Sequence, residues 1–145
     1  MSAINTGRMI GGGLLAGLII NVVEFIMNML VIADDWKEVY ASMGITEPGG
    51  AAVGGYVVLA FILGLLIAWV YAAIRPRFGA GPGTAFKAGL AVWVGACFFP
   101  TVGWALMGSI PMRLVIISLV YTLVEVVLGA LAAGAVYQEG RVPAM

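Results

Sequence analysis

The sequence predicts an all-α integral membrane protein, on the evidence of its composition and the length of its apolar runs. Of its 145 residues, 63% are hydrophobic and 10% are charged, whereas a soluble domain is typically about half apolar and about a quarter charged. A chain this short leaves much of its surface facing its surroundings, so that surface must face lipid. We expect a single domain over residues 1–145, an antiparallel bundle of four transmembrane helices.

The four expected helices lie at about residues 9–32, 53–74, 84–107 and 112–137. Each run is long enough to cross the hydrocarbon core of a bilayer, which takes about 20 helical residues. A strand of a membrane barrel would alternate between lipid-facing and lumen-facing residues, and these runs are continuously apolar. The first run is too long for a cleavable signal sequence and contains Glu24, so we expect it to be retained.

A short amphipathic helix is expected at about residues 35–43, between the first two runs. Asp35 and Glu38 have the spacing of a capping box, and Gly44 can end the helix. Apolar side chains repeat at helical spacing: Trp36, Val39, Tyr40 and Met43. Such a helix should lie flat on the outer membrane surface.

Prolines mark two further features. The connection over residues 75–83 is expected to be a tight non-helical turn, in which Pro76 ends the second helix and Thr84 caps the third. Pro100 leaves the carbonyl of Ala96 without its helical donor, which predicts a kink in the third helix.

Basic residues in the connections predict the orientation, because they are enriched on the cytoplasmic side. One side holds Arg8, Arg75, Arg77, Lys87 and Arg141, and the other holds Lys37 and Arg113. Both termini and the 75–83 connection should therefore be cytoplasmic. The run Arg75-Pro76-Arg77-Phe78-Gly79 resembles turns of small bacterial membrane proteins. That resemblance implies no activity, but it favours the bacterial inner membrane as the location.

Two glutamates, Glu24 and Glu125, stand near the middle of the bilayer. A charged side chain there costs about 2.5–3.5 kcal/mol on insertion scales, and no lysine or arginine lies at comparable depth. Each glutamate should therefore be protonated, hydrogen-bonded to polar neighbours or bound to a cation. We predict one shared polar site between the first and fourth helices, lined by Glu24, Glu125, Asn21, Asn28, Tyr121 and Thr122.

Small and polar residues support this pairing of helices, because they allow close packing in lipid. They recur every three or four residues in both segments, as Gly13, Gly17, Asn21, Glu24 and Asn28 and as Ser118, Thr122, Glu125, Gly129 and Ala133. Turning either stripe toward lipid would be costly. Mutual burial of the two stripes is the simplest arrangement.

These residues favour two classes of function. The first is a small proton- or cation-coupled transporter or channel, expected to be a homo-oligomer, in which the glutamates exchange a proton for a cation such as Na⁺ or Mg²⁺. The alternative is a non-catalytic structural or accessory subunit of a larger membrane complex, in which neutral glutamates bridge helices.

Other classes are disfavoured by what the sequence lacks. It contains no histidine and one cysteine, Cys97, so neither a metal site nor a cofactor is expected. Without a serine–base pair or a metal cluster, an enzyme acting on lipid is not expected either. The net charge is zero, which gives no reason to expect nucleic acid as a partner. The lipid bilayer is the expected environment.

Overall fold

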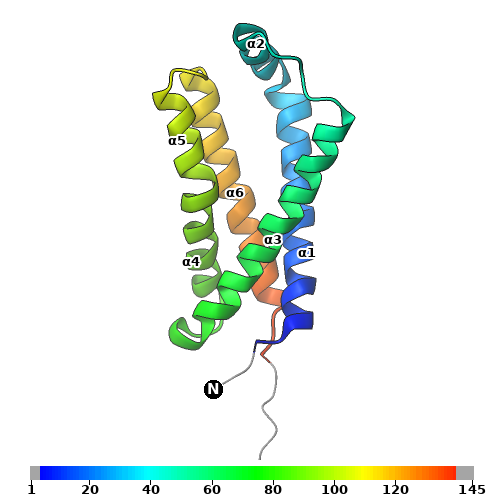
Figure 1. The fold of residues 1–145 in the computed structure, drawn as a ribbon. Coiled ribbons are helices and arrows are strands. Elements are labelled where there is room, and N and C mark those ends of the chain that lie inside the picture. The colour runs from blue at the N-terminus through cyan, green and yellow to red at the C-terminus, as the bar shows by residue number, and fades with distance from the viewer. Residues whose placement is uncertain (1–3, 140–145) are drawn as a thin grey trace, which may run out of the picture.

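A computed structural model describes residues 4–139 as a bundle of helices (Figure 1). Four helical segments are long and apolar enough to cross a membrane, which confirms the predicted fold class. In chain order they are α1 (Thr6–Ile26) with η1 (Met27–Val31), α3 (Gly50–Phe78), α4 (Pro82–Trp93) with η2 (Val94–Phe98) and α5 (Phe99–Leu106), and α6 (Met112–Val136). The outermost residues of both termini, including Arg141, lie outside the described residues.

Helix α6 is the centre of the bundle, since it packs against α1, α3 and α4. Helix α1 packs against α3 as well as α6. Helix α3 crosses the bundle at a tilt, so that it lies near α4 at one end and near α1 at the other (Figure 1). Among the described helices, α5 packs on η2 and α6 and makes no extensive contact with α1 or α3.

Glycines bring α1 and α3 into backbone contact. A Cβ atom on Gly13 would lie 2.8 Å from Cα of Leu65, and one on Gly17 would lie 2.7 Å from Cα of Phe61. A Cβ atom on Gly64 would collide with the backbone of both Gly13 and Gly17. Such close approach is how helices associate in lipid, where apolar burial provides no driving force.

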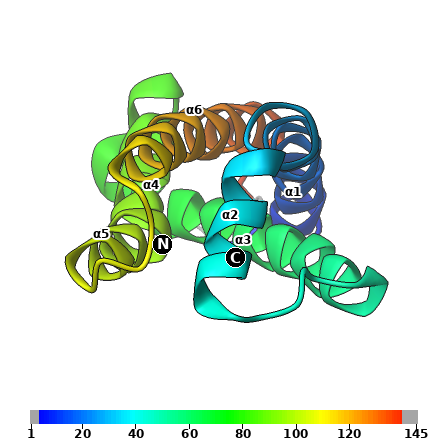
Figure 2. The same cartoon turned by 90° about the horizontal axis from the view of Figure 1, so that it is seen from above.

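The short helix α2 (Ala33–Met43) lies across one end of the bundle, over the space between the long helices (Figure 2). We call this end the α2 end. A cluster of buried side chains holds it there, formed by Ile32, Val39 and Leu114. Gly44 ends the helix in the left-handed conformation, with φ 67°, as predicted.

The predicted capping box of α2 is wrong. The helix begins at Ala33, two residues before Asp35, and no side chain caps it. The fully buried Ile32 is the only residue between η1 and α2, so burial of Ile32 sets the start of the helix. Asp35 instead forms an ion pair with Arg113 at the start of α6.

The predicted break at Pro76 is also wrong. Helix α3 continues through Pro76 to Phe78, and the Gly79 amide donates to the Arg75 carbonyl at 2.8 Å. A proline this near the end of a helix removes one hydrogen bond without preventing a last turn. The connection therefore shortens to Gly79–Gly81. Thr84 does not cap α4, because this helix begins at Pro82. The Thr84 hydroxyl instead donates to the Phe78 carbonyl at 3.2 Å.

A π-helical turn, η2, directly precedes Pro100 in the third membrane-spanning segment. The Phe99 amide donates to the Val94 carbonyl across this turn. Pro100 has no amide hydrogen with which to continue the α-helical pattern. The α-helical hydrogen bonding is thus interrupted next to the predicted kink.

Candidate functional site

A carboxyl pair lies between α1 and α6. Glu24 projects from α1 and Glu125 from α6, and Tyr121, one turn before Glu125 on α6, donates to Glu24 Oε2 at 3.4 Å, so the two carboxyl groups are neighbours. Glu125 is 1% exposed, whereas Glu24 is partly exposed. The two helices pack closely because Gly129 of α6 lies against Ala16 of α1. We call Glu24 and Glu125 the glutamate pair.

Two of the predicted polar neighbours contact the glutamate pair. Asn28 Nδ2 donates to Glu24 Oε2 at 2.5 Å, and the Tyr121 hydroxyl donates to the same oxygen at 3.4 Å. Within the described part of the chain, Glu125 Oε2 is buried and has no hydrogen-bond partner. A buried, charged carboxyl oxygen without a partner is costly, so burial favours a protonated Glu125 or one that is paired with a cation.

The other two predicted neighbours bond elsewhere. Asn21 Nδ2 donates to the Gly17 carbonyl at 2.9 Å and to the Val57 carbonyl of α3 at 3.3 Å. Asn21 therefore joins α1 to α3. Thr122 Oγ1 donates to the Ser118 carbonyl at 2.6 Å and accepts from Trp93 Nε1 at 3.0 Å. Thr122 therefore joins α6 to α4.

Trp93 and Cys97, one helical turn apart, complete the side of the site formed by α4 and η2. Both are partly buried against the core beside Val126 of α6. Trp93 was not predicted as a site residue. The sequence did contain a signal for Trp93. A buried indole N–H needs a hydrogen-bond acceptor, and the apolar helices contain few side chains that can accept one.

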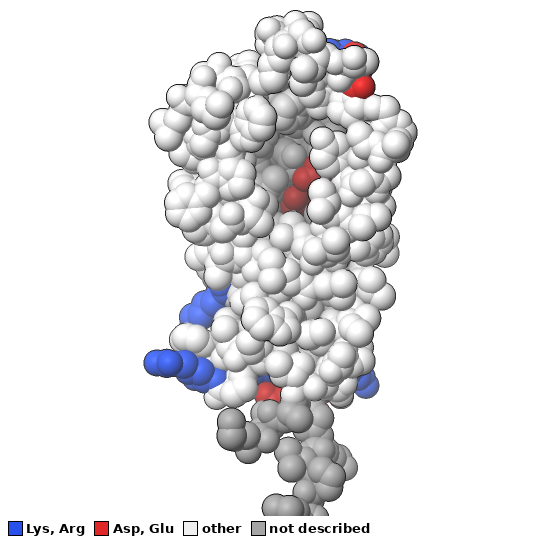
Figure 3. All heavy atoms as spheres, viewed as in Figure 1, with Lys and Arg blue, Asp and Glu red and all other residues white. Residues whose placement is uncertain are grey.

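The space-filling view shows a hollow in the side of the molecule, in the half nearer α2 (Figure 3). Acidic atoms lie on its floor. Glu24 and Glu125 are the acidic residues of the four membrane-spanning segments. Glu125 is buried and Glu24 is partly exposed, so we attribute the acidic floor to Glu24, with Glu125 beneath it. The hollow lies between α3 and α5, which do not pack extensively against each other (Figures 1 and 3).

One of the two π-helical turns, η1, lies close to Glu24 in sequence, and the other, η2, contains Cys97. The turn η1 begins three residues after Glu24. Single π-helical turns are rare and are frequent at functional sites. They occur here in the two segments that present Glu24 and Cys97.

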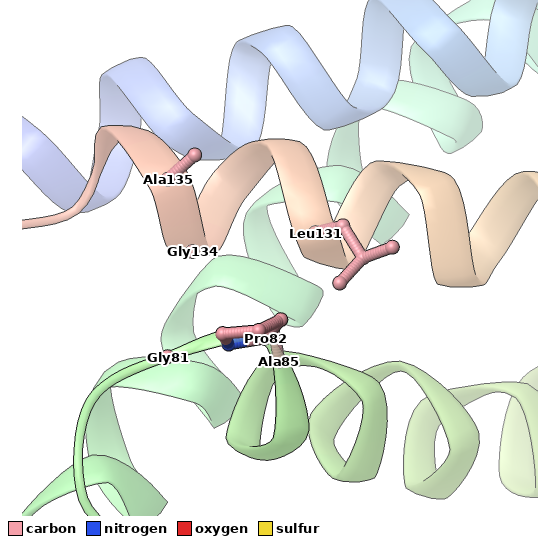
Figure 4. Close-up of a pocket in the computed structure, with 6 residues that line it drawn as sticks. All are labelled: Gly81, Pro82, Ala85, Leu131, Gly134 and Ala135. Carbon is pink, nitrogen blue, oxygen red and sulfur yellow. The ribbon is translucent and has the colours of Figure 1, made fainter.

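A pocket lies near the opposite end of the bundle, between the start of α4 and the end of α6 (Figure 4). Its lining consists of small and apolar residues, namely Gly81, Pro82, Ala85, Leu131, Gly134 and Ala135. It offers no titratable side chain. The glutamate pair is therefore the better candidate for a functional site.

Over residues 4–139, no group of three or more His, Cys, Asp or Glu side chains is placed to hold a metal ion. No known protein family, curated protein or solved structure matches this chain. The glutamate pair and the hollow above it are therefore the features of the chain that point to a function.

Proposed function

We propose that the protein is a small transporter or channel that moves protons or cations by way of the glutamate pair. The observation that carries the proposal is that Glu24 of α1 and the buried Glu125 of α6 lie next to each other, beside a hollow in a membrane-spanning bundle. Ionisable residues within membrane segments commonly mark ion pathways and proton relays.

The pair has the chemistry that coupled exchange requires. Two carboxyl groups in one low-dielectric site do not both ionise cheaply, so they hold a shared proton. A cation that binds the pair displaces a proton from it, and a returning proton displaces the cation. One proton then crosses the membrane for each monovalent cation that crosses in the opposite direction. Asn28 and Tyr121 stabilise the charged form by donating to Glu24.

The proposal includes an orientation and an assembly. Arg8, Arg75, Arg77 and Lys87 belong to the end of the bundle opposite α2, so we place that end in the cytoplasm of a bacterial cell and α2 on the outer surface of its inner membrane. A homo-oligomer is expected, because four helices rarely enclose a solute path by themselves.

Flux measurements in proteoliposomes test the proposal. Glutamine keeps the size and the hydrogen bonding of a protonated glutamate but cannot exchange a proton. We expect Glu24→Gln and Glu125→Gln to fold normally and to abolish a pH-dependent flux that the unchanged protein supports. Glu47→Gln is the matched control, because Glu47 is exposed and lies outside the four membrane-spanning segments.

Another pattern of results would replace the proposal with the accessory-subunit alternative. In that pattern, both glutamine variants keep every activity, while alanine or leucine at either position destabilises the protein. The glutamates would then serve to hold α1 and α6 together.

A further inference from the structure

The route into the hollow is lateral. Helix α2 lies across the end of the bundle above the hollow (Figure 2), where the Ile32–Val39–Leu114 cluster and the Asp35–Arg113 ion pair hold it. The hollow opens instead on the side of the molecule, between α3 and α5 (Figure 3). In a membrane this side faces lipid. A ligand that enters this way comes from the bilayer.

The floor of the hollow selects for positive charge. Glu24 lies there with Glu125 buried beside it, and neither of the membrane-spanning segments that carry them contains a lysine or arginine at their depth. Glu125 Oε2 is enclosed and without a hydrogen-bond partner in the described part of the chain. A cation is the ligand that complements such a site.

Aromatic side chains near the glutamate pair favour an organic rather than a hydrated inorganic cation, because Trp93 donates to Thr122, which lies one turn before Glu125 on α6. On the α4–η2 side, Trp93 and Phe98 pack together with ring centroids 5.5 Å apart, and both are partly exposed. Aromatic faces attract organic cations. A hard inorganic cation needs about six oxygen ligands or retained water, whereas the pair and its two donors offer few oxygens and the route passes through lipid.

We propose that the hollow binds a lipophilic organic monocation, with its charge against the glutamate pair and its apolar body in the opening between α3 and α5. This inference rests on the proposed function and names the substrate class of the same site. Binding is an exchange: the cation forms an ion pair with one carboxylate, and the proton that this carboxyl group held passes to water.

Equilibrium binding of tetraphenylphosphonium to the full chain in lipid nanodiscs tests the inference. Tetraphenylborate is the matched probe, because it has nearly the same shape and the opposite charge. We expect the cation to bind in preference to the anion, with release of a proton and with weaker affinity at lower pH. Glu24→Gln and Glu125→Gln should each weaken binding about tenfold or more, and Glu47→Gln should leave it unchanged.

Equal binding of both probes, or binding that both glutamine variants retain, would overturn the inference. Should a glutamine variant fail to fold, the pH dependence of cation binding by the unchanged protein still decides the question. If flux depends on the glutamates but tetraphenylphosphonium does not bind, the substrate class is wrong and the proposed function stands. If the cation binds through the glutamates and no flux occurs, the site stands and transport is wrong.

Discussion

Glu24 and Asn28 form a unit on one face of α1, because residues four apart in a helix are neighbours. Asn28 donates to the Glu24 carboxyl group, while Asn21, seven residues earlier, donates to the backbone of α3. Two asparagines on the same helix therefore have different partners. Asn28 can stabilise a negative charge on Glu24, and Asn21 holds α1 against α3.

This difference gives a matched pair of variants. Asn28→Ala removes a hydrogen bond to a group that must become charged in each exchange, so we expect it to lower the flux in proteoliposomes about tenfold. Asn21→Ala should lower thermal stability in detergent and leave the flux of the folded protein nearly unchanged. Equal losses of flux in both variants would contradict the role given to Asn28.

At the scale of the elements, α1 lies between two partners, and its small residues divide between them. Gly13 and Gly17 lie against α3, whereas Gly12 and Ala16 lie against Ala133 and Gly129 of α6. The sequence stripe predicted one partner, α6, for Gly13 and Gly17. Residues four apart drift by about 40° around a helix, so such a stripe turns gradually from one neighbour toward the next. Its spacing alone does not say which helix each residue meets.

The contact between α1 and α3 predicts a specific stability effect. Gly64→Ala places a methyl group against the backbone of Gly13 and Gly17, which neither helix can accommodate without moving apart. We expect a loss of about 1–3 kcal/mol in the free energy of unfolding, measured by thermal or denaturant unfolding in detergent. Gly55→Ala in the same helix is the control, since nothing lies within 4 Å of its added Cβ atom. A similar loss in both variants would argue against close α1–α3 packing.

At the scale of the whole molecule, hydropathy predicted the four membrane-spanning segments because about 20 consecutive apolar residues leave few other structures. The errors arose where tertiary packing overrode a local signal. Burial of Ile32, not Asp35, determined where α2 begins, and α3 continued past Pro76. The glutamates and Asn28 could be chosen from the sequence because polar groups are rare in lipid-facing helices. The partners of Asn21 and Thr122, and the hollow itself, depend on how the helices cross.

The proposed orientation of the molecule can be measured directly. In a protein with Cys97 replaced by serine, a cysteine at Ser42 in α2 should react with an impermeant thiol reagent in intact cells. A cysteine at Ala80, in the connection between α3 and α4, should react only after the membrane is opened. Both positions are exposed, so access by the reagent is set by the side of the membrane. Labelling of Ala80 but not Ser42 in intact cells would reverse the orientation.

We propose that Glu24 and Glu125 hold a proton between them inside the membrane. Infrared spectroscopy of the protein in lipid tests it most directly, because a protonated carboxyl group and a carboxylate absorb at different frequencies. At neutral pH we predict a protonated-carboxyl band that Glu24→Gln and Glu125→Gln each shift, that the double variant loses, and that Glu47→Gln leaves unchanged. A spectrum at neutral pH with no such band, or with one that persists in the double variant, would show that the two glutamates hold no proton there.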